Sequence, residues 1–295
     1  MTGRVLVTGY RGFIGGHLCR RLIDDGYDVV GADIGGASKA EAEHHQCDVS
    51  DYSSVSRLPK DVDYIIHLAG IAFVPKAASD FVKTYDVNFL GTYNMLKFYA
   101  QSKADNFLFA SSAKVYGAPM KLPMGEDHPL NPQDTYGRSK KAAEDAIRAF
   151  HSENGRPATI VRQFNTFGPG QGGDFFIPTL ARQLGKGDVL RLGNLDVRRD
   201  FLYVGDLVEA YITLLAGKGG GIETYNAGSG ESVLLKDVVA EAAKIWGRKP
   251  SIQSDASKAR SEAAEIRCDN TRLRALGWKP KVKMSEGLKK IKEAM

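Results

Sequence analysis

Short apolar runs alternate with stretches of helical periodicity over the first two-thirds of the chain. The apolar runs predict strands at residues 4–8, 28–33, 63–68, 106–110 and 158–162. Between these strands, apolar positions recur at helical spacing at roughly 14–25, 80–103 and 136–153. Such alternation is typical of a parallel sheet joined by crossover helices, so we expect an α/β protein with a doubly wound sheet.

The later part of the chain has a different pattern. From Pro169 to Gly187, glycine and proline mix with aromatic residues, which favours an insertion over a ligand rather than a strand of the sheet. A strand edge with a helix at 203–215 and a late strand at 223–227 resume the earlier pattern. An amphipathic helix begins after Gly228, and a basic helix closes the chain. We therefore expect a second, smaller lobe built from more than one segment.

Composition excludes several classes of protein. Of 295 residues, 43% are hydrophobic and 25% are charged, and no apolar run reaches the ~18 residues that cross a bilayer. The net charge of +5 is too small and too scattered to indicate a nucleic-acid partner. Cys19, Cys47 and Cys268 lack the paired spacing of a zinc site, and the first strand begins too early for a signal peptide. We expect a reduced, cytoplasmic protein that binds neither metal nor membrane.

Three glycines at every third position follow the first predicted strand. The segment Gly9-Tyr10-Arg11-Gly12-Phe13-Ile14-Gly15 leads directly into a predicted helix. Glycine allows backbone N–H groups to approach a pyrophosphate, and the helix N-terminus adds partial positive charge. The turn therefore predicts a dinucleotide site, although glycines also serve plain strand-to-helix packing.

Residues at the ends of the following strands extend this prediction. Asp33 ends the second strand, where a carboxylate accepts both ribose hydroxyls and repels a 2′-phosphate, so it favours NAD over NADP. Arg11 favours NADP instead, because its guanidinium could meet a 2′-phosphate. Asp48 and Val49 are expected near the adenine, and Leu68, Ala69 and Gly70 offer small residues where the chain passes the cofactor. An ordinary loop aspartate is the alternative for Asp33.

A tyrosine and a lysine are the strongest chemical signal. Tyr136 and Lys140 are four residues apart on a predicted helix, so their side chains share one face. An ammonium and an oxidised nicotinamide would stabilise the phenolate of a tyrosine, which can then remove a hydroxyl proton as hydride leaves. Ser111 and Ser112 follow the 106–110 strand at the edge where such sheets bind ligands, and a serine there can hold the reacting oxygen. The alternatives are a surface pair and turn-forming serines.

Further motifs follow in a fixed order along nearly the whole chain. They include Asn88, Arg162-Gln-Phe-Asn165, Gly168-Pro169-Gly170, Arg199-Asp200-Phe201, Tyr225-Asn226-Ala227-Gly228 and Gly277-Trp278-Lys279-Pro280. Together with the glycine turn and the Ser112, Tyr136 and Lys140 trio, these motifs resemble the extended short-chain dehydrogenases/reductases that act on nucleotide-sugars.

The resemblance implies a division into two domains and a set of ligand contacts. Residues 1–162 with 203–228 would form a Rossmann-type domain that binds NAD(P), and residues 163–202 with 229–295 a lobe that binds the nucleotide-diphosphate sugar. Asn88, Ser111 and Phe164 would contact the cofactor. Asn165, Phe175, Arg199 and Arg260 would contact the substrate, the two arginines by clamping its diphosphate. A homodimer through the helices at 80–103 and 136–153 is also implied.

The resemblance leaves two reactions open. Ala113 and Lys114 stand where sugar 4,6-dehydratases of the family carry acidic residues, so dehydration is not expected. The Ser-Ala-x-Val-Tyr-Gly sequence is closer to UDP-hexose 4-epimerases, which oxidise C4 transiently to a 4-keto sugar. Gly193-Asn-Leu-Asp196 looks more like the GDP-sugar branch, which includes 4-ketoreductases of NDP-4-keto-6-deoxy sugars. We favour the 4-epimerase, with the 4-ketoreductase as the alternative and a non-catalytic NAD(P) sensor as a minor one.

Overall fold

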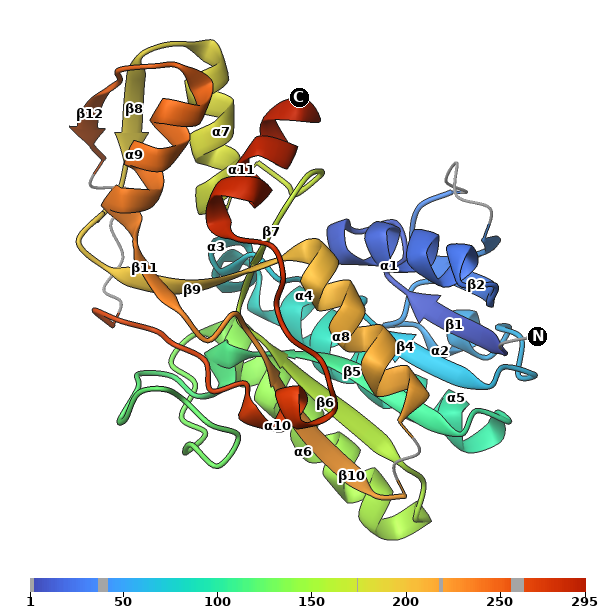
Figure 1. Ribbon diagram of the computed structural model, residues 1–295. Coiled ribbons are helices and arrows are strands. Elements are labelled where there is room, and N and C mark those ends of the chain that lie inside the picture. Colours follow the sequence, from blue (N-terminus) through green and yellow to red (C-terminus); the bar gives the residue numbers. More distant parts are fainter. Residues whose placement is uncertain (1–2, 37–41, 174, 218–219, 256–262) are drawn as a thin grey trace. The chain divides into compact units, whose positions relative to one another are not determined.

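A seven-stranded sheet carries most of the predicted strands. In the computed structural model, which describes residues 3–36, 42–173, 175–217, 220–255 and 263–295, its strand order is β10-β6-β5-β4-β1-β2-β3 (Figure 1). The bounds are β1 (Arg4–Thr8), β2 (Asp28–Asp33), β3 (Glu43–Gln46), β4 (Tyr64–His67), β5 (Asn106–Ser112), β6 (Ala158–Gln163) and β10 (Ile222–Ala227). The pairs from β3 through β6 are parallel. The prediction of a doubly wound parallel α/β sheet is therefore confirmed.

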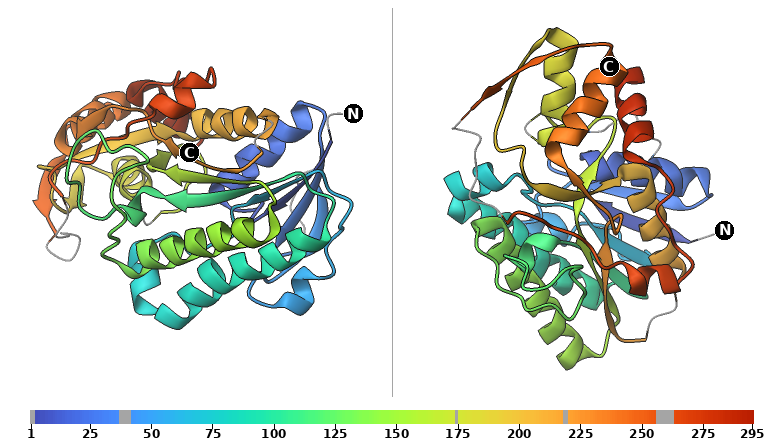
Figure 2. Two further views of the ribbon diagram at one scale, coloured as in Figure 1. Left: turned by 90° about the horizontal axis from the view of Figure 1, so that it is seen from below. Right: turned by 60° about the vertical axis from the view of Figure 1, so that its left-hand side comes forward.

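Helices cover both faces of this sheet. Figure 2 shows α1 (Phe13–Asp24) and α8 (Val204–Ala216) on one face and α5 (Gly91–Gln101) and α6 (Thr135–Asn154) on the other. The sheet is well buried: all seven residues of β5 are buried, and a core cluster joins it to the apolar faces of α5 and α6. Shorter helices are α2 (Tyr52–Val55), α3 (Val74–Ser79), α4 (Phe81–Tyr85) and the 3-10 turn η2 (Ala113–Val115).

Local sequence signals explain the position of α6. Asp134 caps its N-terminus by accepting a hydrogen bond from the backbone N–H of Gly137 at 2.7 Å. Gly155 ends it in the left-handed conformation, with φ of 66°, which glycine adopts without strain. The helix therefore begins just before Tyr136, and this fixes where that side chain lies.

One predicted helix is three elements in the structure. The range 80–103 consists of α4, the π-helical turn η1 (Asp86–Leu90) and α5. A π-helical turn inserts an extra residue without ending the apolar periodicity, so the pattern alone did not separate it from an α-helix. Its centre is the fully buried Asn88.

The chain divides into two compact units. Unit 1 consists of residues 1–117, 129–163 and 208–225, and unit 2 of residues 118–128, 164–207 and 226–295. The segment 118–128, which the sequence placed with the dinucleotide-binding domain, belongs to unit 2 in this division. The second unit is therefore assembled from three stretches of sequence.

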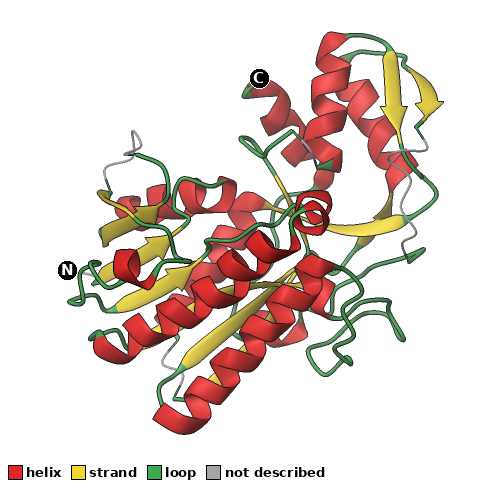
Figure 3. Cartoon of the chain, turned by 180° about the vertical axis from the view of Figure 1, so that it is seen from behind, coloured by secondary structure: helices red, strands yellow, loops and turns green. Residues whose placement is uncertain are grey.

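Unit 2 has its own small sheets and its own core. A three-stranded sheet has the order β11-β9-β7, and β8 pairs with β12 in parallel. Apolar residues of three helices and of β8 form one core cluster. Figure 3 shows helices in red and strands in yellow. The bounds are β7 (Asn165–Phe167), α7 (Phe176–Lys186), β8 (Val189–Leu192), β9 (Arg198–Tyr203), β11 (Ser232–Leu234), α9 (Leu235–Trp246), β12 (Ser251–Ser254), α10 (Thr271–Ala275) and α11 (Met284–Glu293). The predicted insertion at 169–187 is thus largely the helix α7.

Candidate functional site

The glycine turn connects β1 to α1 with close backbone packing. Gly9 has φ of +69°, and a Cβ there would lie 2.8 Å from the backbone N of Ala69. A Cβ at Gly15 would overlap the carbonyl oxygen of Gly9. Both glycines are therefore required by packing, whatever else they do. Gly12 is the N-cap of α1 and supplies no side-chain cap, so the N-terminal amides of this 12-residue helix receive no acceptor from it. An incoming phosphate fits that role.

Asp33 and Arg11 meet at Gly35, beyond the end of β2. The Asp33 carboxylate accepts backbone N–H groups from Arg11 at 3.3 Å and from Gly35 at 3.1 Å. A Cβ on Gly35 would overlap Nη1 of Arg11, so the guanidinium lies directly against this glycine. The Asp33 carboxylate, which would favour ribose hydroxyls, and the Arg11 guanidinium, which would favour a 2′-phosphate, are thus neighbours.

Asp48 and Val49, which are expected near the adenine, follow β3. The Asp48 carboxylate accepts hydrogen bonds from the backbone and hydroxyl of Ser50. Burial opposes ionisation of Asp48, but these bonds and the ammonium of Lys83 leave its pKa below the usual value. Val49 is buried, and its carbonyl accepts from Asn94.

A chain of hydrogen bonds joins two predicted cofactor contacts, Ala69 and Asn88. The backbone N of Ala69 donates to Thr8 Oγ1, which lies 2.7 Å from Nδ1 of His67. Nε2 of His67 lies 3.2 Å from Thr92 Oγ1, and that hydroxyl donates to the carbonyl of Asn88. Thr92 therefore accepts the Nε2 proton, and His67 is a neutral, buried link. Burial lowers its pKa to about 3, and the charge of Lys140 acts in the same direction.

Asn88 and Gly70 shape the space beside Lys140. Asn88 accepts from the backbone N of Ile71 at 2.8 Å and donates to Ser139 Oγ at 2.9 Å. A Cβ on Gly70 would lie 3.1 Å from Asn88 Oδ1 and 3.2 Å from Lys140 Nζ. Glycine is thus the residue that leaves room between these two polar groups.

Tyr136, Lys140 and Ser112 come together in unit 1. Ser112 ends β5 and hydrogen-bonds the Tyr136 side chain, which is 9% exposed. Lys140 is 3% exposed, and its Nζ donates to the carbonyl of Ala110 on β5 at 2.8 Å. The ammonium is therefore tied to the strand that carries the serine.

In the protein without a ligand, Tyr136 is not the phenolate that the sequence led us to expect. Burial raises the pKa of Tyr136 to about 12, and the hydrogen bond from Ser112 opposes this only in part. Burial lowers the pKa of Lys140 to about 8, which still leaves an ammonium at neutral pH. Tyr136 is thus a phenol, ready to donate a proton, until further positive charge stabilises its anion.

The sequence analysis missed a second buried tyrosine next to this trio. Tyr211 on α8 is fully buried, and burial raises its pKa, as does the neighbouring Tyr136. Its hydroxyl accepts a hydrogen bond from Gln163 Nε2 at 2.5 Å. The sequence predicted a helix at 203–215 but gave no sign of this tyrosine or of its polar partner.

The residues expected to contact the sugar nucleotide belong to unit 2. Asn165 donates to the carbonyl of Asp200, and Phe164 is buried. Arg199 is also buried, and its Nη1 donates to the carbonyls of Arg198 and Ala263. Phe175 is exposed at the N-cap of α7, whereas Arg260 lies outside the described residues.

Asp200 organises the turn beside these residues. Its carboxylate accepts hydrogen bonds from the backbone N of Ser229, Gly230 and Cys268, and from the Ser229 hydroxyl. The Arg199-Asp200-Phe201 motif thus contains one residue whose role within unit 2 is structural. Burial raises the pKa of this carboxyl, and the hydrogen bonds oppose that effect.

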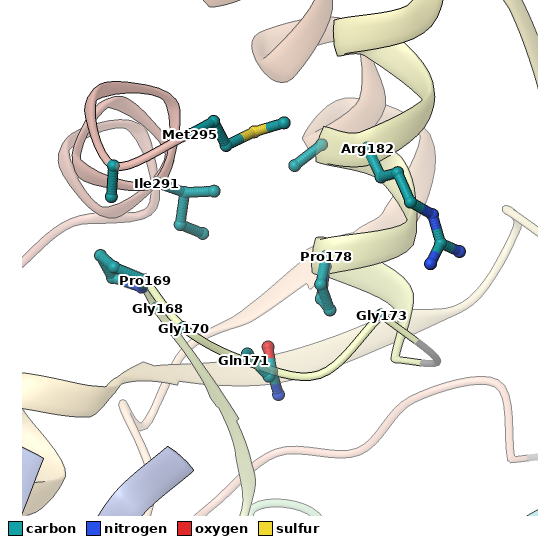
Figure 4. A pocket seen from close by; sticks show the side chains of 11 residues that line it. Gly168, Pro169, Gly170, Gln171, Gly173, Pro178, Arg182, Ile291 and Met295 are labelled. Carbon is teal, nitrogen blue, oxygen red and sulfur yellow. The ribbon is translucent and has the colours of Figure 1, made fainter. Parts of the chain in front are cut away.

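A cavity of about 220 Å³ lies within unit 2. Figure 4 shows Ile291 and Met295 on one side of it, Pro178 of α7 on another and Gln171 at its base. The other lining residues are Ala294 and residues of the 168–173 turn and of α7, including Arg182. The cavity is mainly apolar.

Metal-binding groups and membrane-spanning helices are both absent from the described parts of the chain. These parts contain no group of three or more His, Cys, Asp or Glu placed to hold a metal ion. None of their helices combines the length and the hydrophobicity that crossing a bilayer requires.

The relatives found by comparison with known sequences include a reductase, 4-epimerases and a decarboxylase. The chain is 34% identical to GDP-6-deoxy-D-mannose reductase of Pseudomonas aeruginosa over 304 residues, which covers 99% of this chain and 96% of that protein. It is 31% identical to a putative UDP-glucose 4-epimerase of Methanocaldococcus jannaschii over 299 residues, covering 97% and 96%.

The similar solved structures also include both a reductase and a 4-epimerase. The structure of RMD from Pseudomonas aeruginosa complexed with NADPH matches with a TM-score of 0.87 and 31% identity, covering 99% of this chain and 98% of that one. UDP-glucose 4-epimerase of Thermotoga maritima with UDP-glucose matches with a TM-score of 0.91 and 27% identity over the same shares. Residues 5–228 match the sequence model of the NAD dependent epimerase/dehydratase family. The chain belongs to that family, whose members resembling it are enzymes acting on nucleotide sugars.

Proposed function

We propose that the chain catalyses redox chemistry at C4 of a nucleotide-diphosphate sugar, with NAD(P) as cofactor, and that the reaction is 4-epimerisation. The observation that carries the proposal is the buried trio of Ser112, Tyr136 and Lys140 at the end of β5. A nicotinamide bound there would accept and return the hydride.

Each member of the trio has a distinct task. Ser112 holds the sugar oxygen and orients the Tyr136 hydroxyl. Tyr136 takes up and returns the proton of the C4 hydroxyl. Lys140, tied to Ala110, keeps a positive charge near the phenol and favours its anion when a proton must be accepted.

The glycine turn and the residues around it fit a dinucleotide. The uncapped N-terminus of α1 would hold the pyrophosphate, and Asp33 the adenosine ribose. Gly70 and Asn88 leave space beside Lys140 for the nicotinamide end. In unit 2, Phe164, Asn165, Phe175, Arg199 and Arg260 stay proposals for cofactor and substrate contacts.

The second candidate is 4-ketoreduction of an NDP-4-keto-6-deoxyhexose. Two observations favour it: Arg11 lies beside Asp33 at Gly35, where a 2′-phosphate would be recognised, and a 34% identical relative is a GDP-sugar reductase. In that reaction Tyr136 donates its proton once. The phenol form of Tyr136 suits this step directly.

One experiment separates these reactions. Purified protein is denatured, the released nucleotide is identified, and turnover of UDP-, GDP-, dTDP- and CDP-hexoses is measured with and without NADPH. Stoichiometric NAD with redox-neutral turnover would support the epimerase. An empty site with NADPH consumption on a 4-keto sugar would support the reductase. Tight dinucleotide without sugar turnover would reject both and leave a sensor.

Cofactor preference should depend on two neighbouring side chains. We expect Asp33→Ala to raise the affinity for NADP relative to NAD by roughly 10-fold, because the repulsion of a 2′-phosphate is lost. Arg11→Ala should change the ratio in the opposite direction. Titration of both cofactors by fluorescence measures the ratio. Asp28→Ala, at the far end of β2, is the control, and an unchanged ratio in the Asp33 variant would contradict the ribose contact.

A homodimer is proposed through the surface of α4 and α5. Phe81, Val82 and Tyr93 are exposed there, whereas Met95 and Phe98 are buried against the sheet. Light scattering should give particles of roughly twice 32.1 kDa. Val82→Asp should give single chains, because a charge would be placed in an apolar contact. Particles of one chain in the unchanged protein would reject this surface as a dimer interface.

A further inference from the structure

An ion pair lies in the interior of unit 1, behind the proposed catalytic trio. Arg162 Nη2 is 2.7 Å from Glu144 Oε2, and Arg162 Nε is 3.0 Å from Oε1. The side chains are 2% and 0% exposed. Two charges withdrawn from water persist only where good geometry and further hydrogen bonds compensate for their lost hydration. Burying such a pair costs desolvation free energy, so the other contacts of its two side chains are informative.

The outer atoms of the pair bind both ends of the segment that contains Ser112. Ser111 Oγ donates to Glu144 Oε1 at 2.5 Å, and Arg162 Nη1 donates to the Tyr116 hydroxyl at 3.1 Å. Residues 111 and 116 bracket Ser112 and the turn η2. Ser111 is also the register partner of Arg162 on the neighbouring strand. The serine segment is thus held at two points.

One member of the pair, Glu144, is on the helix α6, which carries the other catalytic groups, and Arg162 is on the strand β6. Tyr136, Lys140 and Glu144 follow one another at intervals of four residues on α6, so they lie along one face. Glu144 therefore connects α6 to the end of β5 on one side of the strand. Ser112, the last residue of β5, hydrogen-bonds Tyr136 of the same helix.

We propose that Glu144 and Arg162 are positioning residues, which lock the Ser111–Tyr116 segment to α6 and so set Ser112 against Tyr136 and Lys140. This inference rests on the proposed function of that trio. Neither residue touches the reacting atoms. Glu144 acts through Ser111 and Lys140, and Arg162 through Tyr116.

Glu144 also acts on Lys140 through its charge. The titratable groups around the ammonium are Glu144 on the same helix, which is charged, and the imidazole of His67 from β4, which is neutral at physiological pH. Arg148 lies 3.9 Å from Glu144 on the solvent side. The Glu144 carboxylate raises the pKa of Lys140, against the larger effect of burial. Removing this negative charge lowers that pKa further.

The experiment compares kinetics of four variants in the full-length protein. Glu144→Gln should lower kcat by at least ~10-fold and leave dinucleotide affinity within about 3-fold. It should also move the bend in the pH dependence of kcat that reports the pKa of Lys140 to lower pH. Ser111→Ala and Tyr116→Phe each remove one hydrogen bond and keep the ion pair, so they should lower kcat by a few fold without moving the bend. Asp145→Asn, which breaks an exposed pair with Lys141 on the same helix, should change neither quantity.

The outcomes are distinguishable from failure of the proposed function. If the unchanged protein turns over no nucleotide-sugar, the proposed function itself is wrong. If it is active and Glu144→Gln keeps its kcat and its pH profile, the positioning role is wrong. Should Glu144→Gln not fold because Arg162 loses its partner, Ser111→Ala and Tyr116→Phe decide: unchanged kcat in both overturns the inference, and a lower kcat in folded protein supports it.

Discussion

Tyr136→Phe is expected to lower turnover at least ~100-fold while dinucleotide affinity stays nearly unchanged. The substitution removes the only oxygen of that side chain and keeps the ring, so the packing on α6 is preserved. General acid–base catalysis by a positioned side chain typically contributes a factor of this size or more. The pKa of about 12 makes the group a phenol at neutral pH in the protein alone, so in 4-ketoreduction its own proton would be the one transferred.

A matched control separates chemistry from stability. Tyr99 is also buried, and its hydroxyl donates to the carbonyls of Asp105 and Pro157 away from the trio. Tyr99→Phe removes a buried hydroxyl of the same kind and should leave turnover within a few fold. Steady-state kinetics on a panel of nucleotide-sugars makes the comparison. Near-normal turnover in Tyr136→Phe would remove this residue from its assigned role.

The second large effect is a loss of folding stability in mild acid caused by His67. The unfolded chain binds a proton to this histidine near the ordinary pKa of 6.5, whereas the folded protein binds it only near 3. Between these values the unfolded state holds the extra proton, so stability falls as the pH drops from 6.5 towards 3. At ~1.4 kcal/mol per pKa unit, the loss over this window is on the order of 5 kcal/mol.

Denaturant unfolding at a series of pH values tests this effect. His67→Gln keeps a polar, neutral group beside Thr8 and Thr92 and should show a much smaller loss between pH 6.5 and pH 4. His151, whose ring hydrogen-bonds the Arg156 carbonyl at the end of α6, gives the control His151→Gln. Parallel loss of stability in the unchanged protein and in His67→Gln would show that carboxylates, not His67, govern the acid limb.

Sequence patterns predicted the apolar strands of the sheet well, but β3, whose four residues are Glu-His-His-Gln, was not among the predicted ranges. The bounds of β1 and β2 agree with the predicted ranges, since their burial leaves little polar character. β12 was missed because its four residues are all exposed, and Ile252 is the one apolar residue among three polar ones. The short strands of unit 2 carry too few residues for a period to be read.

The candidate site was predictable in kind but not in its support. Spacing placed Tyr136 and Lys140 on one face, and the structure brings Ser112 to them. Glu144 continues the same spacing, yet nothing in the sequence indicated that it would be buried with Arg162 from a strand 18 residues later. The neutral His67 link was hidden for the same reason: burial and partners come from the packing of distant segments.

The chain crosses between unit 1 and unit 2 five times, after residues 117, 128, 163, 207 and 225. No single cut can release either unit with its sequence intact. A hybrid that exchanges the second unit with that of a relative must therefore transplant three separate stretches together. Recombination at one breakpoint would split at least one unit, so new specificities in this architecture are more readily gained by point substitution than by shuffling.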